Sequence, residues 1–158
     1  MIHINLVCIG KIKEDYLKNA ITEYSKRLSK YCKLNIIELN DEAIPDNLSD
    51  KMTENIKKLE GSRILSNIKN SYIISLDLRG KQYSSEEFSN KLENISISNS
   101  SITFIIGGSL GLSKNVIESS NELISFSKMT FPHQLIRVFL LEQLFRAFKI
   151  QNNEKYHR

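Results

Sequence analysis

Apolar and polar positions repeat along the chain with two alternating periods, and this pattern predicts a regular order of strands and helices. Short apolar runs rich in β-branched residues are typical of strands, and they occur at residues 2–9, 34–39, 72–78, 102–106 and 123–127. Between them, apolar residues recur at the spacing of an amphipathic helix, at residues 15–31, 49–69, 84–95 and 135–150. Five such alternations predict one α/β domain, residues 1–158, with a mostly parallel sheet and helices on both faces.

Capping and turn-forming residues place several helix ends. Ser84, with Glu87 three positions later, forms the capping box that opens a helix, and Ser113 is a candidate N-cap of a further helix. Pro132 marks the start of the last helix. Gly61 lies inside the second helical stretch, and because glycine is a weak helix former we expect a break there.

The last helical stretch, residues 135–150, is apolar around most of its circumference. A helix of this kind has to be covered on more than one side. Because a small single sheet covers one side only, the pattern favours a second copy of the chain as the remaining cover. We therefore expect a homodimer, with a helix deeply buried in a monomer as the alternative.

The composition is that of a soluble globular protein, with 41% hydrophobic and 25% charged residues. The apolar runs are far shorter than the ~18 residues that a membrane span needs, and the first residues lack the signals of a secretory leader. We expect a cytoplasmic protein with no membrane partner. The net charge of +4 and the isoelectric point near 9.0 are a weak indication of a polyanionic partner.

Cysteine and histidine are too few and too scattered to predict a disulfide framework or a structural metal site. Cys8 lies in a strand-like run and Cys32 near a helix end, so both are expected to be buried or inert thiols. The three histidines belong to no metal-binding motif of the C-x-x-C or H-E-x-x-H kind. We expect no bound metal.

Three of the six glycines, Gly107, Gly108 and Gly111, follow directly after the strand-like run at 102–106. Glycine permits a tight turn and a close approach of ligand to backbone. In α/β proteins small molecules bind at the carboxyl ends of the sheet strands, where such a loop would lie. The sequence therefore predicts a ligand site at this loop.

Three kinds of chemistry compete for the glycine loop. Its G-G-x-x-G spacing departs from the dinucleotide fingerprint. It does match G-x-S-x-G, which would make Ser109 the nucleophile of a serine hydrolase; His133 or His157 would be the base and Glu118 or Glu122 the acid. The third possibility is a cofactor held by backbone groups between this loop and residues 126–134, which end the last strand at the same sheet edge.

Four segments together carry a resemblance to a known family: residues 104–112, 127–137, 142–147 and 156–158. In this combination and order the chain resembles the ribosomal RNA large subunit methyltransferase H family, which belongs to the SPOUT superfamily of trefoil-knotted methyltransferases. The resemblance implies a C-terminal trefoil knot, S-adenosylmethionine as cofactor and a homodimer. It also implies methylation of a pseudouridine of 23S rRNA at N3, on the assembled ribosome. A non-catalytic RNA-binding dimer is a further alternative.

The resemblance also assigns site residues. The cofactor contacts it implies are Leu76, Gly107, Phe126, Ser127, Lys128, Met129, Thr130 and Phe131. The candidate catalytic residues are Glu142, Arg146, Tyr156, His157 and Arg158. One departure is Lys155, which stands where the family often has proline.

The chemistry of the reaction suggests roles for the candidate catalytic residues. His157 could accept the N3 proton, Arg146 or Arg158 could stabilise the resulting anion, and Tyr156 could stack on a base. Simpler roles stay open. Glu142 and Arg146 could form only a helical i, i+4 ion pair, and Arg137 could be a solvated charge or a charge at the dimer rim.

Overall fold

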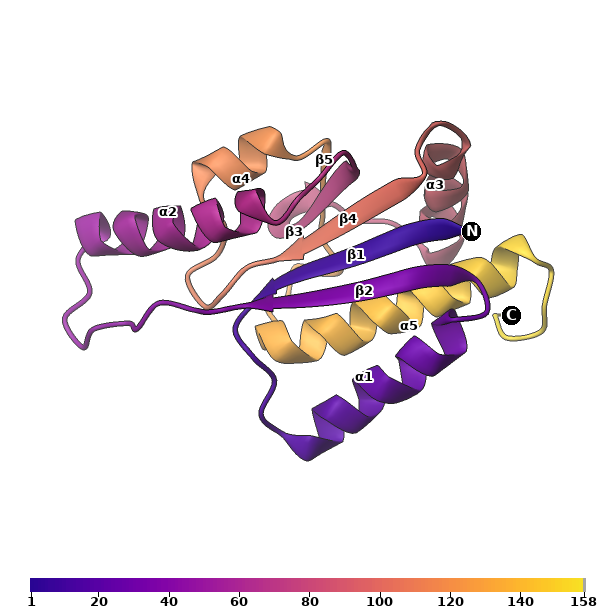
Figure 1. Cartoon of the computed structure of the whole chain (residues 1–158), viewed down its shortest axis with the longest axis horizontal. Helices are drawn as coiled ribbons and strands as arrows, with labels where there is room; N and C mark the ends of the chain where they lie inside the picture. Colours follow the sequence, from indigo (N-terminus) through magenta and orange to yellow (C-terminus); the bar gives the residue numbers. More distant parts are fainter. Residues whose placement is uncertain (158) are drawn as a thin grey trace.

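The computed structural model describes residues 1–157, which build one five-stranded sheet covered by helices (Figure 1). The strands are β1 (Ile2–Ile9), β2 (Cys32–Leu39), β3 (Tyr72–Lys81), β4 (Ser101–Ile106) and β5 (Glu122–Ile124). The helices are α1 (Asp15–Leu28), α2 (Asp50–Ser66), α3 (Ser85–Ser98), α4 (Lys114–Ser119) and α5 (His133–Gln151). The strand order is β2-β1-β4-β3-β5 and every pairing is parallel, which confirms the α/β prediction.

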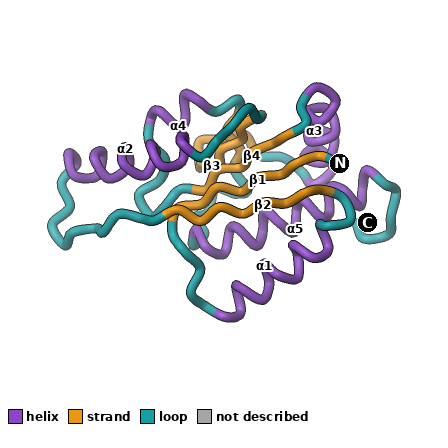
Figure 2. Tube along the Cα trace, viewed as in Figure 1, coloured by secondary structure: helices purple, strands orange, loops and turns teal. Residues whose placement is uncertain are grey.

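The sheet separates two layers of helices (Figure 2). Successive side chains of a strand point to opposite faces. In β1, Leu6 and Cys8 accordingly join the core under α1, α3 and α5, whereas Val7 and Ile9 join a smaller core under α2 and α4. Burial on both faces explains why the strands read as nearly continuous apolar runs.

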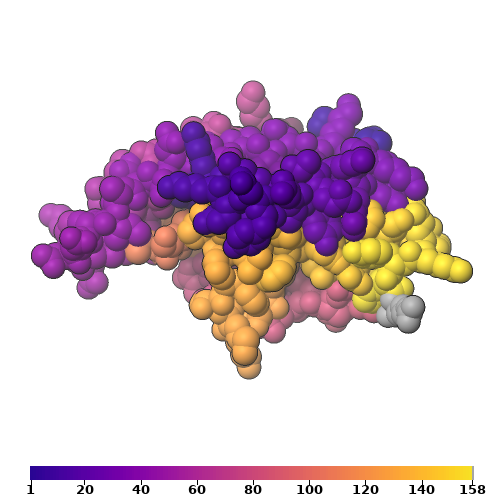
Figure 3. Space-filling model, turned by 90° about the horizontal axis from the view of Figure 1, so that it is seen from below, coloured from indigo at the N-terminus to yellow at the C-terminus, as the bar shows by residue number. Residues whose placement is uncertain are grey.

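Helix α5 is covered on several sides within one subunit. It lies against the sheet between α1 and α3, and Figure 3 shows α1 (indigo) beside α5 (orange to yellow). The expectation that this subunit covers only one side of the helix is therefore wrong, because two flanking helices add to the sheet. The part of α5 that this subunit leaves uncovered is a narrower face that includes Phe139, which is 38% exposed. The homodimer stays a prediction, and it rests on this face.

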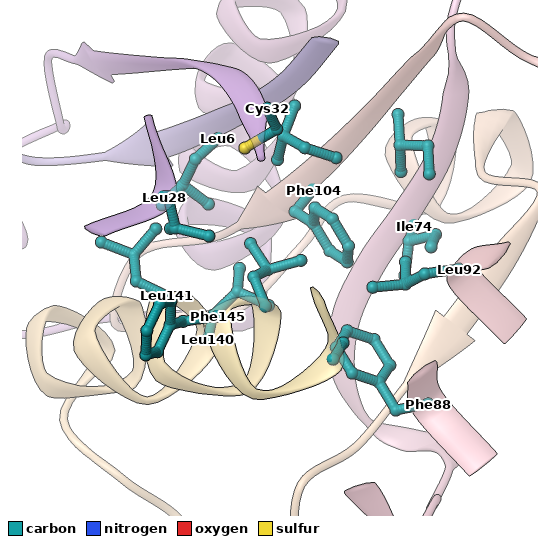
Figure 4. Close-up of a cluster of buried hydrophobic side chains, with 14 of the residues drawn as sticks. Leu6, Leu28, Cys32, Ile74, Phe88, Leu92, Phe104, Leu140, Leu141 and Phe145 are labelled. Carbon is teal, nitrogen blue, oxygen red and sulfur yellow. The ribbon is translucent and has the colours of Figure 1, made fainter. Parts of the chain in front are cut away.

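The larger core is centred on α5 (Figure 4). Leu140, Leu141 and Phe145 of this helix belong to one buried cluster with Leu6 and Phe104 of the sheet. Burying each such side chain stabilises the fold by roughly 1.5–3 kcal/mol. The core fixes the position of α5, and so of the segments at both of its ends.

Several element ends differ from the sequence prediction. Helix α1 ends at Leu28 and not at residue 31, and the Tyr31 ring beyond it stacks on Phe148 of α5 with 5.6 Å between ring centroids. Strand β5 covers only Glu122–Ile124, and the next residue, Ser125, still donates from its amide to the Lys81 carbonyl of β3. The capping box of Ser84 and the N-cap at Ser113 are confirmed.

Both cysteines are buried and free. Burial raises the pKa of the Cys8 thiol to about 12 and that of the Cys32 thiol to about 11. No helix within residues 1–157 is long and apolar enough to cross a membrane. Nor does this part of the chain bring together three histidine, cysteine, aspartate or glutamate side chains that could hold a metal ion.

Gly61 does not break α2, which runs unbroken from Asp50 to Ser66. The glycine is buried where α2 meets the start of α4, and a Cβ there would lie 2.3 Å from Ser113 Oγ and 3.2 Å from Val116 Cγ2. Ser113 Oγ also caps α4, accepting a hydrogen bond from the Val116 amide. The residue is therefore a glycine because two helices approach closely.

We expect Gly61→Ala to destabilise the protein by about 1–2 kcal/mol, because the added methyl displaces the Ser113 cap or overpacks the contact. Helix propensity alone predicts the opposite sign, a gain of up to about 1 kcal/mol. Urea unfolding measures the difference. Ser62→Ala, at the exposed neighbouring position, is the matched control and should change stability by less than about 0.5 kcal/mol. A more stable Gly61→Ala would contradict this account.

Candidate active site

A cavity of about 540 Å³ opens at the carboxyl edge of the sheet, where β3, β4 and β5 end. This is the predicted position for a ligand in a parallel sheet. Seven of the eight predicted cofactor contacts line it: Leu76, Gly107, Phe126, Ser127, Met129, Thr130 and Phe131. Lys128 is not among the lining residues, and its side chain is exposed.

The glycine loop forms one wall of this cavity and is closed on itself. The Gly111 amide donates to the Gly108 carbonyl at 3.1 Å, and Gly111 has φ +88°, a conformation that favours glycine. A Cβ on Gly107 would lie 2.8 Å from Leu112 Cδ2 and 3.2 Å from the Gly111 carbonyl. Gly107 is therefore required by the tight turn that the sequence predicted, through its close approach to Leu112 and Gly111.

The segment after β5 forms the opposite wall. Its start is ordered by local hydrogen bonds, from Ser125 Oγ to the Ser127 carbonyl at 2.8 Å and from the Met129 amide to Ser127 Oγ at 3.0 Å. The Met129 side chain is 73% exposed. Phe131 packs edge-on against Phe139 of α5, with 5.5 Å between ring centroids.

The end of β3 adds a third wall that the sequence analysis missed. Arg79 donates from Nε and Nη2 to the two carboxylate oxygens of Asp77 at 2.8 and 2.9 Å, and its amide donates to Oδ1. These hydrogen bonds lower the pKa of Asp77 below its usual range. Both residues line the cavity, so it carries a carboxylate at one side. The D-x-R spacing after an apolar run was the available signal.

Arg137 anchors the start of α5 next to the cavity. Its guanidinium is fully buried and donates to the carbonyls of Ile9 and Gly10 and to Glu38 Oε2, each at 2.9 Å. The interpretation of Arg137 as a solvated or dimer-rim charge is wrong. One turn earlier, His133 lines the cavity, and burial together with the Arg137 charge lowers its pKa. Both effects favour the neutral form of His133.

Four of the five candidate catalytic residues form one cluster at the far part of α5. Glu142 Oε1 accepts from Arg146 Nη2 at 2.5 Å and Nε at 3.1 Å, which raises the pKa of Arg146. The guanidinium lies 4.8 Å from the centroid of the Tyr156 ring, and Arg146 Nη1 lies 3.1 Å from His157 Nδ1. Arg158 lies outside the described residues.

The C-terminal segment reaches this cluster because the chain reverses after α5. Asn153 adopts φ 53°. The Glu154 carboxylate accepts hydrogen bonds from Lys149 Nζ at 2.6 Å and from the Tyr31 hydroxyl at 2.9 Å. The helix thus ends at Gln151, and the polar residues 152–155 form the reversal. The turn holds Tyr156 and His157 against their own α5.

The hydrogen bonds of His157 fix its protonation pattern. A guanidinium can only donate, so Nδ1 is the unprotonated nitrogen that accepts from Arg146. The proton is then on Nε2, which donates to Glu86 Oε1 at 2.6 Å. Both ring nitrogens are therefore engaged, and His157 must release one partner before it can accept a proton from a substrate.

A second cavity, of about 280 Å³, adjoins the first cavity and is lined by Glu142 of the cluster. Ile124, Ser125, Phe126 and Phe131 line both cavities. Glu142 and Gln143 line only the second. The structure thus places the predicted cofactor loops and Glu142 of the cluster along two adjoining spaces in one subunit.

A family model described as "Predicted SPOUT methyltransferase" matches residues 2–157. The chain belongs to the SPOUT methyltransferase family. It is 58% identical over 158 residues to the ribosomal RNA large subunit methyltransferase H of Clostridium botulinum strain Eklund 17B, and 60% identical to that of strain Okra. Each match covers 99% of this chain and 99% of the relative. These matches also place the chain in the ribosomal RNA large subunit methyltransferase H family, so it is a methyltransferase that uses S-adenosylmethionine.

A solved structure supports the fold. A probable methylase family protein from Haemophilus influenzae Rd KW20 matches with a TM-score of 0.56 at 14% identity, covering 98% of this chain and 70% of that one. At this identity the likeness concerns the fold alone. The trefoil knot implied by the resemblance stays a prediction.

The first cavity fits S-adenosylmethionine. Its volume is in the range of ligand sites, about 300–1,000 Å³. Leu76, Phe126 and Ile136 offer apolar contact for an adenine ring, and the glycine loop offers backbone groups. The carboxylate of Asp77 is charge-balanced by Arg79, but its Oδ2 accepts only one hydrogen bond from Arg79 and has a further lone pair that can accept from a donor of the ligand.

The hydrolase alternative finds no support in the same cavity. Ser109 lies on the exposed turn of the glycine loop and lines the cavity with His133. Within residues 1–157 no hydrogen bond joins it to a histidine, and His157 is engaged with Arg146 and Glu86 instead. The nucleophile–base pair that a hydrolase needs is thus not assembled, and family membership decides against this alternative.

We expect Gly107→Ala to weaken binding of S-adenosylmethionine roughly tenfold to hundredfold. The added methyl would overpack Leu112 and Gly111 at a cost of about 1–3 kcal/mol, which distorts the wall that contacts the ligand. Titration calorimetry measures the affinity. Leu110→Ala, in the same loop but outside the first cavity, should stay within about threefold of the wild type. Unchanged affinity in Gly107→Ala would contradict the assignment of the cofactor to this cavity.

Proposed function

We propose that this protein transfers a methyl group from S-adenosylmethionine to N3 of a pseudouridine in 23S rRNA of the assembled ribosome, in the cytoplasm. The main support is the cluster of Glu142, Arg146, Tyr156 and His157 beside a cavity that adjoins the cofactor site. The names of the full-length relatives agree with an rRNA substrate. The net charge of +4 suits a polyanionic partner.

The reaction requires that the substrate nitrogen lose its proton. N3 lies between two carbonyl groups, so it is weakly acidic and a poor nucleophile until it is deprotonated. S-adenosylmethionine supplies a methyl group on a positively charged sulfur. In this chain Arg146 can stabilise the N3 anion, and His157 can take the proton once Nδ1 leaves Arg146. Tyr156, beside Arg146, can stack on a neighbouring base.

We further propose that the protein acts as a homodimer through the outer face of α5. Phe131 and Phe139, each 38% exposed, pack edge-on and form an aromatic patch next to the cofactor cavity. Met129, which is 73% exposed, precedes Phe131 by two residues and adds apolar surface there. An exposed apolar patch of this kind marks an interaction surface. A partner seated there would bring its own C-terminal residues near this subunit's cavities.

Loss of the gene should remove one methyl group from one pseudouridine of 23S rRNA, detected by mass spectrometry of the digested rRNA. The wild-type gene should restore it, whereas a gene lacking codons 156–158 should not, because the deleted residues act on the base. The purified truncated protein should bind S-adenosylmethionine within about threefold of the wild type. An unaltered rRNA in the deletion strain would refute the proposed substrate. Full restoration by the truncated gene would refute the role of the C-terminal residues.

Light scattering should give twice the chain mass of 18.2 kDa for the native protein. Phe139→Asp places a charge in the aromatic patch and should yield a monomer at micromolar concentration, since burying an unpaired charge is costly. Ile97→Asp, at a 79% exposed position of α3, is the matched control and should remain dimeric. A monomeric native protein would contradict the homodimer.

A further inference from the structure

Glu142 has one carboxylate oxygen that the rest of the described chain leaves unsatisfied. Oε1 accepts from Nε and Nη2 of Arg146 and lies 3.4 Å from the Tyr156 hydroxyl. Oε2 is shielded from solvent, and no residue within 1–157 donates to it. A buried acceptor without a donor is costly and rare in folded proteins. Since Glu142 lines the second cavity, a ligand in that cavity can supply the missing donor once the side chains that shield Oε2 move aside.

The neighbouring Gln143 offers the opposite polarity in the same cavity. Its Oε1 accepts from the Ser85 hydroxyl at 2.8 Å, which orients the amide group. No described residue accepts a hydrogen bond from its Nε2. Glu142 and Gln143 therefore present an acceptor and a donor side by side.

The rest of the second cavity suits a flat ring. Its walls include the aromatic side chains Tyr83, Phe88 and Phe126, which lie outside the proposed dimer face. Single-stranded RNA bases are bound by stacking on such rings while polar groups contact the base edge. The volume of about 280 Å³ admits a nucleobase.

We propose that the second cavity binds the target base, and that Glu142 Oε2 accepts a hydrogen bond from N1–H while Gln143 Nε2 donates to the adjacent O2. This inference rests on the proposed function. The ribose of pseudouridine is attached through carbon C5, so N1 carries a hydrogen. In uridine N1 is bonded to the ribose, and the corresponding position on the base edge is a carbon that carries a hydrogen. A carboxylate at this place therefore distinguishes pseudouridine from uridine.

Two features of the free protein fit this role. Arg146 holds Oε1, so the direction of the carboxylate is set before the substrate arrives. Recognition of N1–H and O2 leaves N3, the next ring atom beyond C2, unhindered by Glu142 and Gln143. Oε2 is shielded from solvent, so binding includes a local movement of the side chains around it.

A purely structural role for Glu142 makes a different prediction. If the carboxylate only oriented Arg146, its loss would lower the rate on any substrate by the same factor. A specificity contact instead changes the ratio of rates on two substrates that differ at N1. The ratio of kcat/KM on pseudouridine-containing and uridine-containing ribosomes separates the two roles.

The experiment uses ribosomes from two strains, both lacking this methyltransferase and one also lacking the synthase that makes the target pseudouridine. The wild-type enzyme should favour pseudouridine ribosomes by about 10- to 100-fold, the effect of a hydrogen bond to a charged group. In Glu142→Gln the Arg146 donors hold the amide oxygen, so the amide NH₂ faces N1–H. The preference should then fall to within about threefold of unity, mainly through slower methylation of pseudouridine.

Glu86→Gln is the matched control, because Glu86 contacts His157 but does not line the second cavity. Its preference for pseudouridine should equal that of the wild type, whatever its absolute rate. A Glu142→Gln enzyme that binds S-adenosylmethionine and keeps the wild-type preference would overturn the inference. A wild-type enzyme that methylates pseudouridine-containing and uridine-containing ribosomes equally well would also overturn the inference, and this measurement needs no variant. A wild-type enzyme inactive on both kinds of ribosome would refute the proposed function instead.

Discussion

Arg137 carries a positive charge into the interior, between the first turns of α5 and the carboxyl ends of β1 and β2. Removing a guanidinium from water costs several kcal/mol unless its donors are satisfied. Here Nη2 donates to the backbone carbonyls of Ile9 and Gly10, and Nη1 donates to Glu38, which itself accepts from the Ile12 amide; within residues 1–157 only the Nε donor of this guanidinium lacks a partner. Because these acceptors lie on two different strands, the charge is stable only when α5 and both strand ends are in place. Residues 125–132, which join β5 to α5 and form one wall of the cofactor cavity, are called the cofactor segment. This segment is thereby fixed at its C-terminal end.

Helix α5 connects every part of the proposed reaction. Its start follows the cofactor segment, its outer face carries Phe139, and its second half carries Glu142 and Arg146. The chain then turns back through Asn153 and places Tyr156 and His157 on the same helix. A displacement of α5 would therefore move the cofactor wall, the aromatic patch and the base-binding groups together.

The sequence predicted those features that depend on local pattern. The bounds of β1, the capping box at Ser84 and the N-cap at Ser113 follow from the periods and capping preferences of nearby residues. It failed at Gly61 and Arg137, whose environments come from residues more than 50 positions away. The cofactor contacts and the C-terminal cluster came from a family resemblance. Periodicity alone could not show that residues 156 and 157 return to Arg146.

The strand order also has a consequence for how the protein is made. The interior strand β1 is the first to leave the ribosome, yet one of its two neighbours is β4, and the hydrogen bond from Asn5 to Thr103 spans 98 residues. Arg137, which closes the end of β1, is 128 residues from Ile9. Contacts of such long range make folding slow. During translation β1 can pair with β2 early, but its second edge stays unpaired until β4 has emerged, and a chain with such uncovered strands is prone to aggregate.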